Sequence, residues 1–412
     1  MENYKDYALK LFKDLVGKDT QSSETSKTYP STESQLSFGK YLAKLCTDIG
    51  LTDVSCDEYG YITALLPDGD SGSPKIGLIA HMDTSPEFSG KNISPQIHEN
   101  YDGGEIPLKN GITISPSDFP SLNNYKGDTI ITSDGSTLLG ADDKAGICAI
   151  LTAMKYLIDN PSIPRKQIKI AFTPDEEIGK GTKYFKTKKF GCDYAFTIDG
   201  GEIGELNYET FNAARAEITI RGKNVHPGSA KSVMINSALI SAELISCLPP
   251  DEIPSKTCGK EGFYHLNGIN GNVEKTSLNY LIRAFDKNEF NSRKEKIKEI
   301  VSKINKKYGD IVSLNLYDEY YNMYEIIKDT PEPVKLAKEA MTKAGVKPKI
   351  ISVRGGTDGS HLSFMGLPSP NIFAGGHNFH GPYEYLPLNS LLKSAEVIVN
   401  ICSNNDYSAP IY

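Results

Sequence analysis

Short apolar runs that alternate with a helical pattern constrain the fold of this chain more than any other feature. The runs lie at residues 61–66, 75–80, 167–172 and 193–198, and each has the length of a β-strand. Between the second and the third run, residues 145–158 carry apolar side chains at helical spacing. Strands and helices that alternate in this way are typical of βαβ units. The sequence therefore predicts an α/β fold.

Two helices are expected before the first of these strands. Apolar side chains recur at helical spacing around residues 12–16 and 38–49, and the second pattern begins with a capping box of Thr32 and Gln35. Residues 92–137 are different, because they are rich in Asn, Gly, Pro, Ser and Asp. This composition predicts a long excursion that contains a hairpin.

The pattern of elements changes after about residue 210. The predicted elements are strand, helix, strand, strand, helix and strand, at residues 214–222, 234–248, 262–268, 275–286, 291–304 and 310–320. This βαββαβ order is the ferredoxin-like arrangement. From Pro331 the helix and strand alternation resumes, up to a last helix near 389–402. We therefore predict a smaller domain at 211–323, inserted between the two parts, 1–210 and 324–412, of a larger one.

The composition argues against several classes of protein. A net charge of -7 disfavours nucleic acid as the main partner, because a phosphate backbone requires an excess of Lys and Arg on one face. The first residues carry charges where a secretory signal would be apolar, and no stretch approaches the roughly 18 apolar residues of a membrane span. The seven cysteines are scattered, which fits free thiols in a reducing cytosol. A cytoplasmic protein is expected.

Ionisable side chains directly follow the predicted strands. His81 and Asp83 come after the run at 75–80, and their side chains point to the same face because they are two residues apart. The other residues of this kind are Asp142, Asp143, Asp175, Glu176, Glu177, Asp199, His377, His380 and Glu384. Ligands of open α/β sheets bind at the carboxyl ends of the strands, so residues that are remote in sequence can meet there.

This set of side chains predicts a metal site. Carboxylates that crowd together without a counter-charge repel one another and take up protons, and divalent cations remove that penalty. Imidazole and carboxylate ligands without cysteine indicate catalytic zinc, cobalt or manganese. Each residue alone would more often be an ordinary surface or core residue. The hypothesis depends on their joint placement at strand ends.

Several short motifs extend this interpretation to a family. They read HMDTSPE, GADDKAG, DEEIGKG, IDGGEIGEL, NVHPGSAK, RGGTDGS and NFHG. In this order they resemble the motif series of the M20 di-zinc metallopeptidases, most closely the aminotripeptidases, from about residue 20 to 402. The resemblance implies a di-zinc exopeptidase-like catalytic domain, in which helices flank a mixed sheet, with the ferredoxin-like domain inserted as a lid. The implied activity is release of the N-terminal residue from tripeptides.

The resemblance assigns five metal ligands. The family's first zinc matches His81 and Asp199, the second matches Glu177 and His380, and Asp142 bridges both. The implied cofactors are thus two zinc ions per chain, with cobalt or manganese as alternatives. One carboxylate with two oxygens can join two metals about 3.5 to 4 Å apart.

The resemblance also implies roles for residues that are not ligands. Glu176 would be the general base toward the attacking water, and Asp83 would orient His81, because ligating histidines usually donate their other N–H to a carboxylate. The peptide bond between Asp142 and Asp143 would be cis.

Substrate-binding residues are expected in the inserted domain and in the RGGTDGS motif. In the family, the histidine that matches His226 helps to hold the oxyanion. Arg283 and Arg354 are candidates for the terminal carboxylate of the peptide, because a guanidinium binds carboxylate bidentately. Small peptides are the expected partners, nucleic acid and membranes are not, and the sequence leaves open whether the chain forms a homodimer.

Alternative functions remain. Dipeptidases, carboxypeptidases and N-acyl amino acid deacylases share the family's metal centre, and in the family Asp199 as the third acidic ligand favours the aminopeptidase side. A nucleotide-binding protein would also alternate strands and helices, but the chain has no GxGxxG or GxxxxGK[ST] signature. A non-catalytic relative would be expected to have lost ligands or the base, and all of these positions are filled.

Overall fold

The structure is a computed structural model that describes residues 1–404. The chain forms two compact units. Among the described residues, the larger unit contains 1–208, 325–351 and 357–404, and the smaller unit contains Glu209–Tyr324 and Ser352–Gly356. The segment Ser352–Gly356 lies outside the range 211–323 predicted for the inserted domain. No helix in residues 1–404 is long and apolar enough to cross a membrane.

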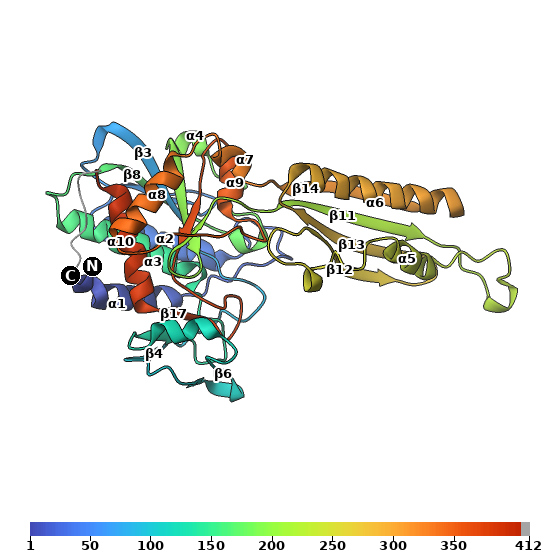
Figure 1. Ribbon diagram of the computed structural model, residues 1–412, viewed down its shortest axis with the longest axis horizontal. Helices are drawn as coiled ribbons and strands as arrows, with labels where there is room; N and C mark the ends of the chain where they lie inside the picture. Colours follow the sequence, from blue (N-terminus) through green and yellow to red (C-terminus); the bar gives the residue numbers. More distant parts are fainter. Residues whose placement is uncertain (405–412) are drawn as a thin grey trace. The chain divides into compact units, whose positions relative to one another are not determined.

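The larger unit is built on an eight-stranded mixed sheet (Figure 1). In sheet order its strands are β1 Thr52–Cys56, β2 Ile62–Leu65, β8 Lys166–Thr173, β3 Asp70–His81, β9 Tyr194–Gly200, β16 Asn371–Phe373, β10 Glu205–Asn207 and β15 Lys349–Ile350. The central strands β8, β3, β9 and β16 are parallel, while β1 and β2 run antiparallel at one edge. This confirms the predicted α/β fold with a mixed sheet.

Helices cover both faces of this sheet, because its central strands are buried on both sides. The helices of the larger unit are α1 Lys5–Val16, α2 Glu33–Asp48, α3 Ala141–Asp159, α4 Thr187–Phe190, α8 Glu332–Lys343, α9 Asp358–Phe364 and α10 Leu388–Cys402, and α7 Tyr324–Ile327 starts at the unit boundary. The buried helix α3 packs against β3 and β9 and also against α1 and α10. On the opposite face, Ile79 of β3 packs with Phe190 of α4 and Leu362 of α9. The sheet is thus enclosed, as expected for parallel strands.

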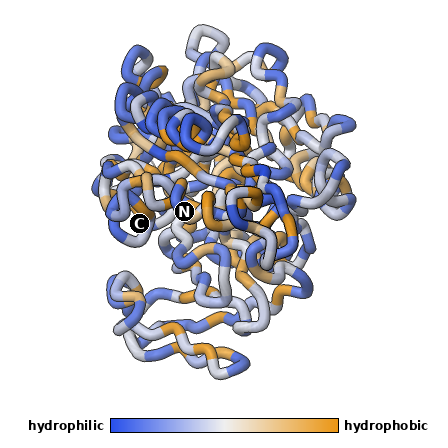
Figure 2. Tube along the Cα trace, turned by 90° about the vertical axis from the view of Figure 1, so that its right-hand side faces the viewer, coloured by the Kyte–Doolittle hydropathy of each residue, from blue (hydrophilic) through white to orange (hydrophobic). Residues whose placement is uncertain are grey.

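The excursion predicted at residues 92–137 has its own small core. It contains the hairpin of β5 Ile106–Pro107 and β6 Thr113–Ile114. Its strands β4 Gln96–His98 and β7 Ile130–Thr132 form a three-stranded sheet with β17 Tyr385–Pro387 from the C-terminal part of the chain, in the order β17-β7-β4. Figure 2 shows hydrophobic stretches distributed along this excursion, which lies at the bottom of the view. Ile106 of the hairpin packs with Tyr125 and Tyr385. The predicted hairpin is confirmed.

The smaller unit has the βαββαβ order expected from the sequence. Its elements are β11 Asn212–Arg221, α5 Ser237–Ser246, β12 Phe263–Gly271, β13 Lys275–Ala284, α6 Lys287–Tyr308 and β14 Val312–Tyr320. The strands form an antiparallel sheet in the order β12-β13-β11-β14, which is the ferredoxin-like arrangement. Both helices cover one face, because Ile240 of α5 and Ile297 of α6 share a buried cluster with Ile218 of β11. In Figure 1, α6 runs along this sheet.

Candidate metal centre

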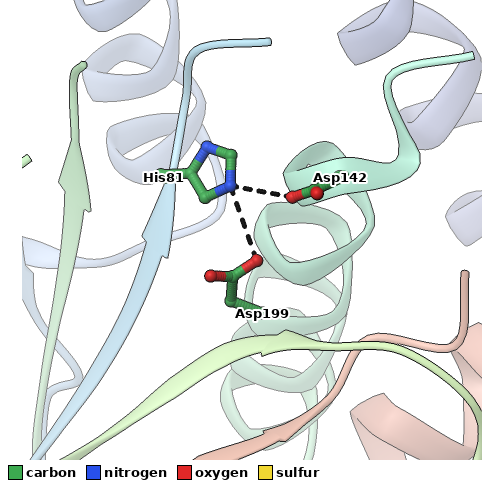
Figure 3. Close-up of side chains that lie close together, drawn as sticks. All are labelled: His81, Asp142 and Asp199. Atoms are coloured by element: carbon green, nitrogen blue, oxygen red, sulfur yellow. Dashed lines mark hydrogen bonds and ion pairs between the residues drawn. The ribbon is translucent and has the colours of Figure 1, made fainter. Parts of the chain in front are cut away.

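Five of the predicted site residues form two overlapping groups in the larger unit. The first group is His81, Asp142 and Asp199, and the second is Asp142, Glu177 and His380. In each group the potential ligand atoms lie within 4.8 Å of one another. Figure 3 shows the first group: His81 from the end of β3, Asp142 from the start of α3 and Asp199 from β9. Asp142 belongs to both groups.

The two carboxylate oxygens of Asp142 face different histidines. Oδ1 lies 2.8 Å from Nε2 of His81, and Oδ2 lies 3.4 Å from Nε2 of His380. The outer members complete each group, since Asp199 Oδ1 is 3.5 Å from His81 Nε2 and Glu177 Oε2 is 3.0 Å from His380 Nε2. A carboxylate that points its two oxygens at two groups has the geometry required to bridge two cations.

The charges of the centre are unbalanced without a cation. Burial, together with the nearby Asp142 carboxylate, raises the pKa of Glu177 to about 8. Burial also raises the pKa of Asp199 to about 6, against the opposing effect of His81. Burial alone would raise the pKa of Asp142, but its contacts with His380 and His81 hold that pKa below its ordinary value. A divalent cation in each group would stabilise the ionised carboxylates.

The donor atoms fit such cations. Imidazole nitrogen and carboxylate oxygen are the ligand types of catalytic zinc and of related divalent ions. Oε1 of Glu177 is buried and has no hydrogen-bond partner among residues 1–404, so one oxygen of this ligand is free for a metal. These observations agree with the ligand set implied by the sequence motifs, and the assignment of the individual ligands stays a prediction.

Asp83 joins His81 to the pair of glutamates. His81 Nδ1 lies 3.5 Å from Asp83 Oδ1 and 3.1 Å from the backbone oxygen of Asp83. The same carboxylate accepts hydrogen bonds from the backbone N–H groups of Glu176, at 2.9 Å, and Glu177, at 3.2 Å. The side chain expected to orient His81 therefore also fixes the backbone of the short helix η4, Glu176–Ile178.

The residue before these glutamates anchors the same loop from its other side. Asp175 is buried and has a left-handed backbone with a φ of 58°. Its carboxylate accepts hydrogen bonds from the backbone N–H of Ser31, at 2.7 Å, and from Nε2 of Gln35, at 2.8 Å, and its own N–H donates to Gln35 Oε1. The capping box predicted for Thr32 and Gln35 is wrong, because Thr32 makes no cap to the backbone of α2 and the Gln35 amide binds Asp175 instead.

A second buried carboxylate anchors Asp142. Glu384 accepts hydrogen bonds from the backbone N–H groups of Leu139, Gly140 and Asp142, at 2.6, 2.8 and 3.1 Å. The peptide bond between Asp142 and Asp143 is cis, as the resemblance implies. The sequence placed Glu384 near the site but gave it no role, because a contact over 242 residues leaves no local pattern.

Two predicted substrate-binding side chains belong to the inserted part of the smaller unit. His226 is exposed, and its Nδ1 accepts a hydrogen bond from the backbone N–H of Gly228. Arg283 pairs with Glu319 at 3.2 Å and donates to the backbone oxygen of Ile282. The guanidinium of Arg283 is therefore already held by a carboxylate, and a substrate would compete with that ion pair. The substrate roles of His226 and Arg283 stay predictions.

Arg354 is also held within the smaller unit. Its guanidinium donates to the backbone oxygens of Gly259, at 2.7 Å, and Glu261, at 3.0 Å, and to Oγ1 of Thr257 at 2.9 Å. It also lies 5.1 Å from the ring centre of Phe211. These contacts connect Ser352–Gly356 to the loop before β12, which explains why this segment belongs to the smaller unit. Its predicted contact with the substrate carboxylate remains untested.

Comparison with known proteins places this chain in a peptidase family. Residues 133–404 match the family described as Peptidase family M20/M25/M40. The chain is similar to Peptidase T of Caldanaerobacter subterraneus subsp. tengcongensis, with 56% identity over 386 residues, which cover 93% of this chain and 94% of that protein. It is also similar to Peptidase T of Clostridium perfringens (strain ATCC 13124), with 55% identity over 392 residues, covering 95% and 97%.

Solved structures share the fold. The crystal structure of aminopeptidase PepT from Bacillus cereus matches with a TM-score of 0.77 and 24% identity, covering 97% of this chain and 98% of that one. A tripeptidase from Staphylococcus aureus matches with a TM-score of 0.78 and 22% identity, covering 97% of both chains. A Bacillus subtilis protein described as a dinuclear metal-binding peptidase matches with a TM-score of 0.66 and 13% identity, covering 97% and 98%. At these identities the structural matches support the fold.

Proposed function

Because the chain belongs to peptidase family M20/M25/M40, we propose that it is a metal-dependent aminopeptidase that releases the N-terminal residue from tripeptides. The observation that carries the proposal is the pair of cation-binding groups that share Asp142, with Glu176 beside them and outside both. The substrate class comes from the relatives named Peptidase T, which are 52–56% identical to this chain.

We propose two zinc ions as the cofactors, with cobalt or manganese as alternatives. His81, Asp142 and Asp199 would hold one ion, and Asp142, Glu177 and His380 would hold the other. Bound divalent ions would act as Lewis acids on the peptide carbonyl and would make water more acidic.

Glu176 is the residue proposed to move the proton. Its backbone is fixed by the hydrogen bond to Asp83, and its side chain makes no ion pair among the described residues. Burial raises the pKa of Glu176 well above its ordinary value, although the proximity of His81 opposes this effect. A carboxylate with a raised pKa is a better acceptor of a proton from the attacking water, and it can then donate that proton to the leaving amine.

The smaller unit would supply contacts to the substrate. His226 would donate to the developing oxyanion, and Arg283 or Arg354 would bind the terminal carboxylate of the peptide. An arginine that pairs with the terminal carboxylate would favour peptides of one length, because a substrate of the wrong length leaves charges unpaired.

We also propose that the protein is cytosolic. Its seven cysteines are free thiols, as is usual for proteins in a reducing compartment.

A panel of peptides tests this function directly. Free and amino-blocked di-, tri- and tetrapeptides are assayed with added zinc, cobalt or manganese. We expect cleavage of tripeptides after their first residue, weak activity on blocked peptides, and a flatter length preference in Arg283→Ala. Faster turnover of N-acyl amino acids than of any tripeptide would contradict the proposal and would indicate a deacylase.

A further inference from the structure

The segment that follows β3 carries a second carboxylate, Glu87, for which the proposed mechanism has no role. We propose that Glu87 is a positioning residue that orients the imidazole of His380 toward its cation, as Asp83 is expected to do for His81. This inference rests on the proposed function, because it assumes that His380 binds a metal. One segment, residues 81–87, would then support both histidines of the centre.

In both histidines, Nε2 faces carboxylates of the candidate metal group and Nδ1 lies near another carboxylate. Nε2 of His380 faces Glu177 at 3.0 Å, and Nδ1 of the same ring lies 3.5 Å from Oε2 of Glu87. In His81, Nε2 faces the carboxylates of its group, and Nδ1 lies 3.5 Å from Oδ1 of Asp83 and 3.1 Å from the backbone oxygen of the same residue. A carboxylate at the second nitrogen fixes the tautomer and the orientation of a ligating imidazole.

His380 has more need of such support than His81. Its side chain is 34% exposed, whereas that of His81 is 3% exposed, so surrounding side chains restrict the His380 ring much less. Its backbone is left-handed, with a φ of 66°, which is uncommon for a residue other than glycine. Glu87 is the charged partner that the described residues place at Nδ1.

The backbone around Glu87 is held in place. Nε2 of Gln21 donates to the backbone oxygens of Ser85, at 2.9 Å, and Phe88, at 2.7 Å, on either side of Glu87. The N–H of Glu87 donates to Oγ of Ser85 at 3.3 Å. The carboxylate itself is 69% exposed, so solvent weakens its effect on His380. We therefore expect an effect at the lower end of the roughly 10-fold to 100-fold range that is usual for such partners.

Calorimetric titration of the metal-free full chain with Zn²⁺ tests the proposal without an activity assay. We expect Glu87→Ala to weaken one of two binding steps about 10-fold and to leave the other unchanged. Glu87→Gln should lose less, because its amide oxygen keeps a hydrogen-bond acceptor near Nδ1 of His380. Glu58→Ala is the matched control, since Glu58 is an exposed acidic residue of the same unit without an ion pair among the described residues. It should bind as the unaltered chain does.

A double-mutant cycle shows whether Glu87 acts through His380. In a His380→Ala background, Glu87→Ala should cause no further loss of Zn²⁺ affinity. An equal loss in both backgrounds would overturn the proposal, as would two unchanged binding steps in Glu87→Ala. Unchanged binding with a higher KM for peptides with free amino groups would also overturn it, and would make Glu87 a contact of the substrate. If the unaltered chain binds no Zn²⁺, the proposed function itself fails. If the unaltered chain binds Zn²⁺ and Glu87→Ala binds it equally well, only the role of Glu87 is contradicted.

Discussion

At the scale of single residues, two adjacent glutamates have different surroundings. Oε2 of Glu177 lies 3.0 Å from His380 Nε2, so Glu177 belongs to one of the two candidate metal-binding groups. Glu176 belongs to neither group. Both backbone N–H groups donate to the carboxylate of Asp83, which holds this part of the backbone in place. This difference is the basis for the proposal that Glu177 binds metal and Glu176 transfers the proton.

Glu176→Gln should remove the base without removing the metal. The amide keeps the size of the side chain but cannot accept the proton, so we expect kcat to fall by about 10² to 10⁴. Metal content, measured by elemental analysis, should equal that of the unaltered chain. Steady-state kinetics on a tripeptide gives the loss in kcat.

The reverse result is expected for Glu177→Gln. This change removes a ligand, so one metal ion should be lost together with activity. If Glu176→Gln lost metal and Glu177→Gln retained it, the roles of the two glutamates would be exchanged.

At the scale of elements, Gln35 of α2 connects to the loop between β8 and η4. Its side-chain amide makes two hydrogen bonds with Asp175, and Asp175 immediately precedes the two glutamates. Gln35→Ala would leave the buried carboxylate of Asp175 with fewer donors. We expect the free energy of unfolding to fall by about 1 to 3 kcal/mol, measured by urea denaturation. The amides of Glu176 and Glu177 should also exchange hydrogen faster, because their loop loses an anchor.

An exposed glutamine provides the control for this change. Nε2 of Gln96 bonds only with Ser94 among the described residues, so Gln96→Ala should change the free energy of unfolding by less than about 0.5 kcal/mol. Equal stability and equal hydrogen exchange in Gln35→Ala and Gln96→Ala would contradict a role for Gln35 in holding the loop.

The same elements show which features the sequence predicts. Apolar periodicity determines each strand and helix locally, so the α/β alternation and the βαββαβ order could be predicted. Ionisable residues at strand ends identified the centre, because parallel strands bring their carboxyl ends to one edge. Glu384 and Asp175 were among those residues, but their anchoring contacts had no local signal, since their partners are remote in sequence. Gln35 was misinterpreted because its spacing from Thr32 fits a capping box, whereas its amide is used in a tertiary contact.

At the scale of the whole molecule, the buried carboxyls predict an unusual dependence of stability on pH in the metal-free chain. Burial raises the pKa of Glu177 from 4.5 to about 8, and that of Asp358 from 3.8 to about 7. The folded state therefore holds protons that the unfolded state releases, so stability should fall as the pH rises from about 4.5 to 7. Above that pH the lowered pKa of the buried Lys144, about 7, acts in the opposite direction.

Urea denaturation at several pH values, with a chelator present, measures how steeply the free energy of unfolding falls with pH. Glu177→Gln should make this slope shallower, because one of the contributing carboxyls is removed. Zn²⁺ should reverse it, because protons compete with the metal for the same carboxylates. Metal-free protein that becomes more stable between pH 4.5 and 7 would contradict the raised pKa values.

The two cation-binding groups differ in exposure, and this difference predicts the order in which metal is lost. The side chain of His380 is 34% exposed, whereas that of His81 is 3% exposed and that of Asp199 is 13% exposed. Water and chelator reach the His380 group more easily, so we expect its ion to leave first. Stopped-flow mixing with a coloured chelator should show two phases of equal amplitude. His380→Ala should abolish the fast phase and preserve the slow one, whereas Asp199→Ala should remove the slow phase. A single phase in the unaltered chain would mean that the shared Asp142 couples the two ions so tightly that they leave together.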